Sequence, residues 1–282
     1  MVVTRFAPSP NGPLHLGHAY AALEAERAAR SAGGRFLLRI EDIDRGRARP
    51  EFEAAIYDDL AWLDLAWERP VRRQSEHFDD YRQALARLRA DGLVYPCFCT
   101  RAEIAAEIAR SQAAPHGPEG PIYPGTCRAL APALASRRCA AGEPFALRLD
   151  VARARVRLGG ARLAWHEQGR GEVEAVPESL GDVVLARKDV PTSYHLAVTV
   201  DDHLQGVTLV TRGQDLFHAT HVHRLLQALL GYGPPEYRHH KLILDAEGRR
   251  LAKRDRAATL AELRAGGLAP DALRRSLGFE RT

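Results

Sequence analysis

Two short segments carry residues whose types and spacing suit phosphate chemistry. The first, RFAPSPNGPLHLGH at residues 5–18, places His15 and His18 three residues apart where a strand gives way to a helix. Such a loop aims backbone N–H groups and the positive end of the helix at an anion, and both imidazoles can face that same anion. The segment indicates a site for nucleotide phosphates. A proline-rich loop with two surface histidines is the alternative.

The second segment is the basic stretch RRLAKRDR at residues 249–256. Its cationic side chains cannot be buried without partners, so the segment faces either water or phosphate. Lys253 is the one lysine among arginines, and its compact, mobile charge suits a phosphate that moves during a reaction. A solvated loop is the alternative when this segment is taken alone.

A third group of residues suits metal chemistry. Cys97, Cys99 and Cys127 supply three thiols, and a structural zinc ion ordinarily takes four ligands. The residues leave the fourth ligand open, with His116 and Cys139 as candidates. A reduced, metal-free loop or a partial disulfide is the alternative.

The elements that position these groups begin with a strand, a helix and a second strand. VVTRFAP at residues 2–8 and RFLLRIEDID at residues 35–44 are apolar strand candidates, and the helix between them ends at Gly33 and Gly34. This order predicts an α/β fold with a Rossmann-like parallel sheet and a ligand at the carboxyl ends of its strands. The helices expected at residues 51–63 and 75–92 have apolar residues on one face.

Pro, Gly and Cys residues cluster between residues 95 and 189, and we interpret this segment as an α+β insertion bearing the zinc site. Strands are expected at residues 145–150, 154–158 (ARVRL) and 181–189, and Thr100 with Glu103 forms a capping box. The expected organisation is a first catalytic half at 1–94, the insertion at 95–189, a second catalytic half at 190–240, and a basic loop with helices at 241–282.

Two features of the second half are read as peripheral or structural. HATHVHR at residues 218–224 carries three histidines, and we expect them on a solvated helix face because no acid or cysteine lies nearby at zinc spacing. Thr259 and Glu262 predict a second capping box near the end of the chain.

The bulk composition is that of an ordinary globular protein. The 282 residues are 45% hydrophobic and 27% charged, with a net charge of +4 and four cysteines. The positive charge weakly favours polyanionic partners. The start lacks the pattern of a secretory leader and the chain has no membrane-length apolar run, so we expect a cytoplasmic protein without a membrane partner.

Several motifs together resemble one family. PLHLGH at residues 13–18 is similar to the HIGH signature of class I aminoacyl-tRNA synthetases, and RLAKR at residues 250–254 is similar to their KMSKS loop. RFAPSPNG, RIEDID, SYHLAVTVDD and TRGQDL resemble the glutamyl and glutaminyl branch of that class. The chain stops about thirty residues after the KMSKS-like motif, which leaves no room for an anticodon-binding domain of 50 or more residues. This feature, with YPCFCT and YPGTCR, resembles the short glutamyl-queuosine tRNA(Asp) synthetases.

The resemblance implies a function and a set of site residues. The implied reaction activates L-glutamate with ATP, which enters with Mg²⁺, and this step needs no protein nucleophile. The activated glutamate is then transferred to the queuosine base in the anticodon loop of tRNA(Asp). The implied catalytic residues are His15, His18 and Lys253, which with Gly17 bind ATP. Glutamate is implied to contact Arg5 and Arg212 through its side-chain carboxylate and Glu41 through its ammonium group. Ala7, Ser9 and Tyr194 are the other implied contacts of glutamate. One structural zinc ion per chain is implied, held by Cys97, Cys99, Tyr123 and Cys127.

The sequence departs from the family pattern in the KMSKS-like loop. Arg250 replaces the first lysine and Ala252 replaces the serine, which bears on the rate more than on the reaction class. Three other functions stay open at this point. They are a truncated glutamyl-tRNA synthetase that charges the 3′ end of tRNA(Glu), a small-molecule nucleotidyltransferase, and an RNA-binding module that has lost catalysis.

Overall fold

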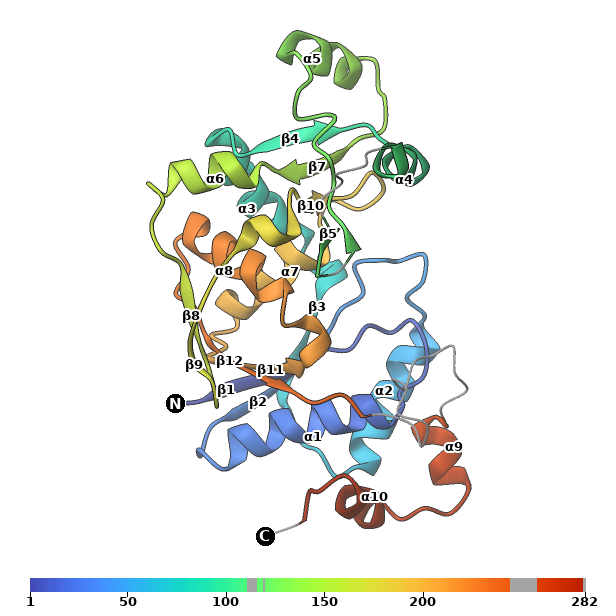
Figure 1. Cartoon of the computed structure of the whole chain (residues 1–282). Coiled ribbons are helices and arrows are strands. Elements are labelled where there is room, and N and C mark those ends of the chain that lie inside the picture. Colours follow the sequence, from blue (N-terminus) through green and yellow to red (C-terminus); the bar gives the residue numbers. More distant parts are fainter. Residues whose placement is uncertain (111–115, 119, 244–257, 281–282) are drawn as a thin grey trace.

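The computed structural model describes residues 1–110, 116–118, 120–243 and 258–280 (Figure 1). Among these residues, no helix combines the length and the apolar character that a membrane span requires.

A parallel sheet forms the centre of the molecule. Strands β1 (Val3–Phe6), β2 (Arg35–Ile40) and β3 (Glu68–Arg73) pair in parallel, and so do β11 (Leu209–Gly213) and β12 (Glu236–His240). The backbone N–H of Thr208 donates to the Val3 carbonyl at 3.0 Å and so joins the two groups beside β1. The strand order is therefore β3-β2-β1-β11-β12, which confirms the predicted Rossmann-like α/β fold.

Alternating residues of β2 supply two separate cores. Phe36, Leu38 and Ile40 pack with α1 (Leu16–Arg30) and α2 (Pro50–Trp62) on one face of the sheet. Leu37 points to the other face, toward α3 (Phe78–Ala90), α7 (Tyr194–Leu204) and α8 (Ala219–Leu230). Because both of its faces are covered, β2 is mainly apolar, as buried parallel strands usually are.

The last helices pack against the first ones. α9 (Leu260–Ala265) and α10 (Pro270–Ser276) contribute Leu260 and Leu273 to the core that α1 and α2 share (Figure 1). Thr259 and Glu262 form the predicted capping box at the start of α9. The C-terminal helices therefore hold the described end of the chain on the α1 side of the sheet.

The segment at 95–189 divides between two sheets. Strands β4 (Val94–Cys97), β7 (Ala146–Leu149) and β10 (Val184–Ala186) form an antiparallel sheet in the order β10-β7-β4. Helix α5 (Pro132–Ala140) lies above this sheet at the top of Figure 1, helix α4 (Arg101–Arg110) lies to its right, and the short pair β5 (His116–Gly117) and β6 (Gly120–Pro121) lies below it. In contrast, β8 (Ala164–Glu167) and β9 (Gly171–Glu174) extend the main sheet next to β12.

One predicted strand in this segment is wrong. Residues 154–157 belong to helix α6 (Val151–Arg157) and Leu158 is its C-cap, so they form no strand. The Asp150 side chain caps this helix by accepting from the Arg153 backbone N–H at 2.9 Å. Val151 and Ala154 are buried at helical spacing while Val156 is 79% exposed, so the alternation of apolar and basic residues does not reflect two faces of a strand.

Candidate functional site

The two histidines of the first motif form the start of α1. The Nδ1 atom of His15 accepts from the Gly17 backbone N–H at 3.1 Å, and Nδ1 of His18 accepts from the His15 backbone N–H at 3.1 Å. Their ring centroids lie 3.9 Å apart. Because each Nδ1 accepts a hydrogen bond, each neutral ring carries its proton on Nε2. Two Nε2–H donors thus lie close together at the positive end of a helix, which suits an anion.

Gly17 is required by the contact between its backbone and His15. A Cβ atom at position 17 would lie 3.0 Å from Cε1 and 3.2 Å from Nδ1 of the His15 ring. The glycine of the motif therefore allows the imidazole to fold back over the first turn of the helix.

The residues that bracket the basic loop contact this same region. The Leu260 backbone N–H donates to the Leu14 carbonyl at 2.9 Å, and Thr259 forms a β-bridge with His15. On the other side of the loop, the His240 ring packs edge-on against Tyr20 of α1. Lys253, Arg250 and Ala252 lie outside the described residues.

A cavity of about 920 Å³ opens at the carboxyl ends of the strands. Ser9 and Glu41 line it from the ends of β1 and β2, and Tyr194 and His195 line it from the start of α7. Its far side reaches the insertion at Cys99, Thr100, Tyr123 and Arg148. The Glu41 backbone N–H donates to the Pro8 carbonyl at 2.9 Å and holds the two loops side by side. Ser9 is exposed and Ala7 is half-buried beside it.

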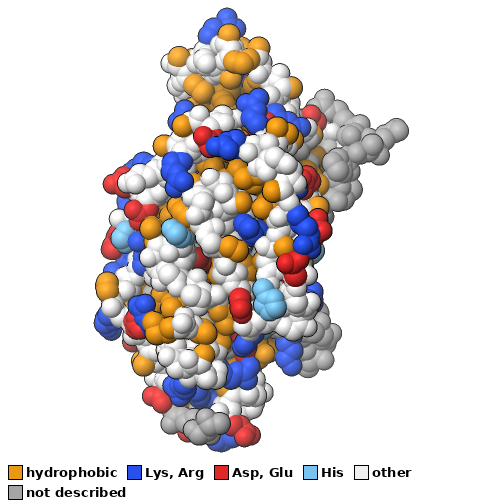
Figure 2. Space-filling view, turned by 90° about the vertical axis from the view of Figure 1, so that its left-hand side faces the viewer, with side chains coloured by type: hydrophobic (Ala, Val, Ile, Leu, Met, Phe, Trp, Pro, Cys, Tyr) orange, Lys and Arg blue, Asp and Glu red, His pale blue; other side chains and the backbone are white. Residues whose placement is uncertain are grey.

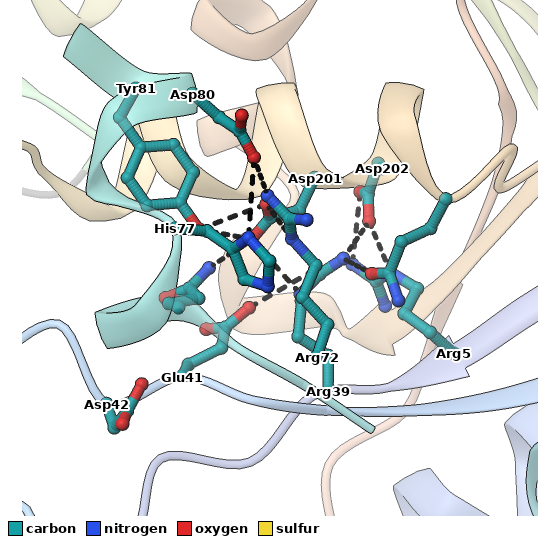
Figure 3. A network of polar contacts seen from close by, with 12 residues as sticks. Arg5, Arg39, Glu41, Asp42, Arg72, His77, Asp80, Tyr81, Asp201 and Asp202 are labelled. Carbon is teal, nitrogen blue, oxygen red and sulfur yellow. Dashed lines mark hydrogen bonds and ion pairs between the residues drawn. The ribbon is translucent and has the colours of Figure 1, made fainter. Parts of the chain in front are cut away.

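Beneath the cavity, three strands each direct one arginine at a pair of aspartates on α7 (Figure 3). Nε of Arg5 on β1 donates to Asp202 at 2.9 Å, and Nη1 of Arg39 on β2 donates to the same carboxylate at 2.8 Å. Nε of Arg72 on β3 donates to Asp201 at 2.7 Å. The Arg39 side chain is 0% exposed, so its charge depends on these carboxylates for compensation.

Glu41 joins this network at the edge that faces the cavity. Its Oε1 atom lies 3.2 Å from Nη2 of Arg39. Burial raises the pKa of Glu41 above its ordinary value, and the charges of Arg39 and Arg5 oppose that rise. Burial would also raise the pKa of Asp202, but Arg5 and Arg39 lower it below its usual value. Asp202 therefore stays ionised between the two arginines.

The arginine predicted on β11 lies in a cluster of rings. Nη1 of Arg212 lies 3.4 Å from the Tyr194 hydroxyl and 3.2 Å from Nδ1 of His223. Its Nε donates to His239 at 3.0 Å and its Nη2 to the Thr220 hydroxyl at 2.6 Å. Charges on Arg212, Glu41 and Arg5 all influence the pKa of Tyr194, which burial raises. The structure thus brings these four predicted glutamate-binding residues into one neighbourhood.

The expectation that residues 218–224 form a solvated histidine face is wrong. His221 and His223 are buried, and His223 is 2% exposed. Nδ1 of His221 accepts from the Val176 backbone N–H at 3.0 Å, and His223 accepts from Arg212. The partners come from β11 and from residues before β10, so spacing within the helix does not reveal them.

The three predicted cysteine ligands meet at the edge of the insertion. The sulfur atoms of Cys97, Cys99 and Cys127 lie within 4.8 Å of one another, and those of Cys99 and Cys127 are 3.4 Å apart. The Tyr123 hydroxyl lies 3.4 Å from the Cys97 sulfur and 3.8 Å from that of Cys99. Tetrahedral zinc with Zn–S bonds of about 2.3 Å sets its sulfur ligands about 3.8 Å apart. This cluster could hold a metal ion such as zinc.

Sequence reasoning missed the residues that hold the predicted ones. Asp201, Asp202 and Arg39 form the buried charge network, and His195 lines the cavity. The sequence does show charged residues beside apolar ones at these positions. Arg39 lies within the apolar run of RFLLRI, and Asp201 and Asp202 directly follow LAVTV. Buried charges of this kind indicate partners elsewhere in the fold.

The chain matches known proteins over nearly its whole length. A family model for the catalytic domain of class I tRNA synthetases for glutamate and glutamine (E and Q) matches residues 1–279. A glutamyl-Q tRNA(Asp) synthetase from Rhodobacter capsulatus is 51% identical, and the alignment covers 99% of this chain and 100% of that protein. A homologous glutamyl-Q tRNA(Asp) synthetase from Symbiobacterium thermophilum is 45% identical over 96% of this chain and 84% of its own length.

Longer proteins match over part of their length. The glutamate–tRNA synthetase structure from Elizabethkingia anophelis has a TM-score of 0.80 and 28% identity, and the match covers 98% of this chain and 61% of that one. The chain thus spans about three fifths of the length of that synthetase.

Proposed function

The chain belongs to the class I synthetases for glutamate and glutamine, and within them to the glutamyl-Q tRNA(Asp) synthetases, and from this membership we propose its reaction. It activates L-glutamate with ATP to glutamyl-adenylate and transfers the glutamate to the queuosine base in the anticodon loop of tRNA(Asp). The observation that carries the proposal is the match to a glutamyl-Q tRNA(Asp) synthetase over that protein's entire length. We infer a cytoplasmic location for this reaction, since its proposed acceptor is a tRNA.

Activation needs positioning and charge stabilisation rather than a protein nucleophile. The α-carboxylate of glutamate is ionised at neutral pH and attacks the α-phosphorus of ATP, which enters as its Mg²⁺ complex. A bond forms between a carboxylate oxygen and the α-phosphorus. The bond between the α-phosphorus and the oxygen that bridges it to the β-phosphate breaks, and pyrophosphate leaves with that electron pair. His15, Gly17 and His18 bind ATP at the start of α1, where the two Nε2–H groups donate to its phosphates.

Lys253 is assigned to the departing pyrophosphate. The support for this assignment is that Thr259 and His240, which bracket the loop, both contact the region of α1 that carries His15 and His18. An ammonium group that moves with the phosphate stabilises the charge that develops on it.

The amino acid binds where opposite charges are already arranged. Arg5 and Arg212 attract its side-chain carboxylate, and Glu41 attracts its ammonium group. Ser9 and Tyr194 contribute hydroxyl groups, and Ala7 contributes backbone next to them. The support is that Ser9, Glu41 and Tyr194 line the cavity and that the charges of Arg5 and Arg212 act on Tyr194 beside it.

The acceptor is a polyanion, and the chain carries a net charge of +4. On the face that Figure 2 shows, Lys and Arg side chains are scattered among Asp and Glu rather than gathered in one patch. That face therefore offers weak electrostatic complementarity to tRNA. The cavity is the better place for the acceptor base, because it lies between the glutamate site and the insertion.

We assign one structural zinc ion to Cys97, Cys99, Tyr123 and Cys127. The spacing of the three sulfurs fits tetrahedral zinc, and the Tyr123 hydroxyl lies on the same cluster. Cys139 is half-buried near the cluster, but its sulfur does not belong to the group of close ligand atoms found in the described residues. Bound zinc would tie β4 to the loop that carries Tyr123 and Cys127.

Pyrophosphate exchange tests the activation step directly. With tRNA(Asp) present and absent, the protein is expected to incorporate labelled pyrophosphate into ATP only when glutamate is added. Lys253→Ala is expected to slow exchange about a hundredfold to a thousandfold while glutamate affinity stays within about threefold. Exchange that needs no amino acid would instead favour a small-molecule nucleotidyltransferase, and undiminished exchange in Lys253→Ala would contradict the role of the lysine.

A further inference from the structure

A row of two histidines connects Arg212 with the cavity. Nδ1 of His223 on α8 lies 3.2 Å from Nη1 of Arg212, and Nε2 of His223 lies 3.2 Å from Nδ1 of His195 on α7. His223 is buried, whereas His195 lines the cavity next to Tyr194. The row therefore begins at a buried guanidinium and ends at the substrate cavity.

The chemistry of arginine fixes which nitrogen of each ring carries a proton. A guanidinium only donates hydrogen bonds, so Nδ1 of His223 accepts and its Nε2–H donates. Nδ1 of His195 must then accept, which leaves the His195 proton on Nε2. Burial and the charge of Arg212 lower the pKa of His195 to about 4, and they also lower that of His223. Both rings are accordingly neutral near pH 7, with one tautomer each.

Arg212 sets a third ring in the opposite tautomer. Its Nε donates to Nε2 of His239 at 3.0 Å, so the proton of His239 lies on Nδ1. That Nδ1–H donates to Glu167 at 2.8 Å. The two histidine rings that contact Arg212 therefore each have one consistent proton position, and neither can exchange its tautomer alone.

We propose that His195 is a specificity-determining residue that donates its Nε2–H to the side-chain carboxylate of glutamate. The proposal rests on the function proposed above. His195 adjoins Tyr194, and the row ties it to Arg212, so it belongs to the end of the site assigned to that carboxylate. Within the described residues, Nε2 of His195 has no hydrogen-bond partner in the protein.

The fixed tautomer explains how such a site rejects glutamine. Both side-chain oxygens of glutamate accept hydrogen bonds, whereas the amide nitrogen of glutamine donates. A histidine that could switch tautomer would accept from that amide. Here the switch would set the Nδ1–H of His195 against the Nε2–H of His223, so the site offers donors only. A donor left facing a donor costs free energy and disfavours the wrong ligand.

Nitrogen-15 NMR of the histidine side chains tests the proton positions independently of activity. At pH 7.5, His195 and His223 are expected as Nε2–H tautomers and His239 as the Nδ1–H tautomer, with each ring assigned in the unaltered protein by through-bond correlation to its own backbone resonances. Addition of glutamate is expected to shift the Nε2 resonance of His195 more than that of His203, which lies on the exposed end of α7. A proton on Nδ1 of His195, or an unmoved Nε2 resonance on glutamate binding, would overturn the proposal.

Substitution tests the role in specificity. His195→Asn replaces a fixed donor with an amide that can present either its oxygen or its nitrogen to the ligand. We therefore expect kcat/KM for glutamate divided by kcat/KM for glutamine to fall at least tenfold. The change is expected mainly in KM. His203→Asn, a matched change on the same helix, should leave the ratio within twofold.

The outcomes separate the two proposals. An unchanged ratio in a folded His195→Asn would overturn the role of His195 while glutamate activation stands. Absence of glutamate-dependent exchange in the unaltered protein would overturn the proposed function and this inference with it. If His195→Asn does not fold, the response of the His195 resonance to glutamate decides.

Discussion

At the residue scale, the charged groups of the site bind one another before a substrate arrives. Asp202 lies between Arg5 and Arg39, and Arg212 is held by Thr220, His223 and His239. Side chains fixed in this way lose little freedom when a ligand binds, which favours both affinity and correct orientation. The site is therefore organised by residues that the substrate does not contact.

Gly17→Ala tests the arrangement at the start of α1. The new methyl group would displace the His15 ring and weaken its bond from the residue 17 backbone N–H. We expect adenylate formation to slow about tenfold to a hundredfold, and stability to fall by about 1 kcal/mol, as for loss of a helix cap.

Gly33→Ala provides the control for that change. Gly33 lies at the other end of α1 with φ of +57°, so alanine there also costs about 1 kcal/mol, but it approaches no other residue. Pyrophosphate exchange and thermal unfolding are measured on both variants. Equal activity losses would mean that Gly17 acts through stability alone.

The pH dependence of glutamate binding tests Glu41. Glu41 binds an ammonium group only when ionised, and its raised pKa means that protonation begins at a higher pH than for an ordinary glutamate. The affinity for glutamate is therefore highest above the pKa of Glu41. It falls as the pH drops through that pKa, by up to about tenfold per pH unit. The expected result is a KM for glutamate that rises as the pH falls, beginning at a higher pH than an ordinary glutamate side chain would give.

Glu41→Gln separates this effect from titration of the ligand. The side-chain carboxyl of free glutamate has a pKa of about 4.3 and contributes its own slope near pH 5. The variant should keep only that slope. Parallel pH profiles for the two proteins would show that Glu41 does not titrate with binding.

The sequence predicted the residue types of the site better than their surroundings. Motifs place His15, His18, Arg5, Glu41 and Arg212 at strand ends and a helix start, because short-range geometry decides these positions. The partners Asp202, His223 and His239 are not predictable from local spacing, because they come from elements distant in sequence that meet only in the folded sheet.

At the element scale, the contact between α2 and α9 holds a buried charge that is only partly compensated. Asp59 on α2 is 1% exposed, and neither of its carboxylate oxygens has a hydrogen-bond partner within the described residues. Arg264 of α9 lies 3.7 Å away. Burial raises the pKa of Asp59 to about 6, and Arg264 only partly opposes the rise. This acid therefore destabilises the contact when it ionises.

Asp59→Asn is expected to stabilise the protein at neutral pH. The folded-state pKa of Asp59 is about 6, whereas an unfolded aspartate titrates near 3.9, so the folded state binds more protons between about pH 4 and pH 6. Stability falls as the pH rises through that window, and the variant escapes the loss. After allowance for screening, we expect a gain of about 1 kcal/mol at pH 7.5 and only about a third of that near pH 4.5.

Urea unfolding at the two pH values measures this gain. Asp58→Asn, a change at the adjacent exposed position, should alter stability by less than about 0.5 kcal/mol at either pH. A destabilised Asp59→Asn at pH 7.5 would mean that the aspartate is needed in its charged form.

Metal analysis tests the ligand set of the insertion. Cys127→Ser is expected to lose most of the zinc, and Tyr123→Phe to weaken its retention against a chelator by at least tenfold. Cys139→Ala serves as the control and should keep one zinc ion per chain. Full retention in Tyr123→Phe together with loss in Cys139→Ala or His116→Ala would reassign the fourth ligand.

The predictability of the elements followed the strength of their local signals. The first strand, helix and strand were evident because apolar runs and terminal glycines agree, and Gly33 has the positive φ that ends α1. Residues 154–158 alternate like a strand but form the end of a helix, because capping by Asp150 and burial of Ala154 outweigh the alternation.

At the scale of the whole molecule, the cavity depends on two parts of the chain. Its inner wall is the edge of the parallel sheet, and its outer wall is the sheet and cysteine cluster of the insertion. The insertion also sends β8 and β9 back to the main sheet beside β12, so the two parts are joined by more than the chain crossings (Figure 1). A base held against the insertion would thus lie close to activated glutamate.

The most direct test of the account is the position at which glutamate becomes attached to RNA. The protein is incubated with ATP, labelled glutamate and purified tRNA(Asp) that carries or lacks queuosine, and nuclease fragments are then separated. We predict label only on the queuosine-bearing tRNA(Asp), within the anticodon fragment. Label at the 3′ end of tRNA(Glu), with none in the anticodon fragment of tRNA(Asp), would contradict the account.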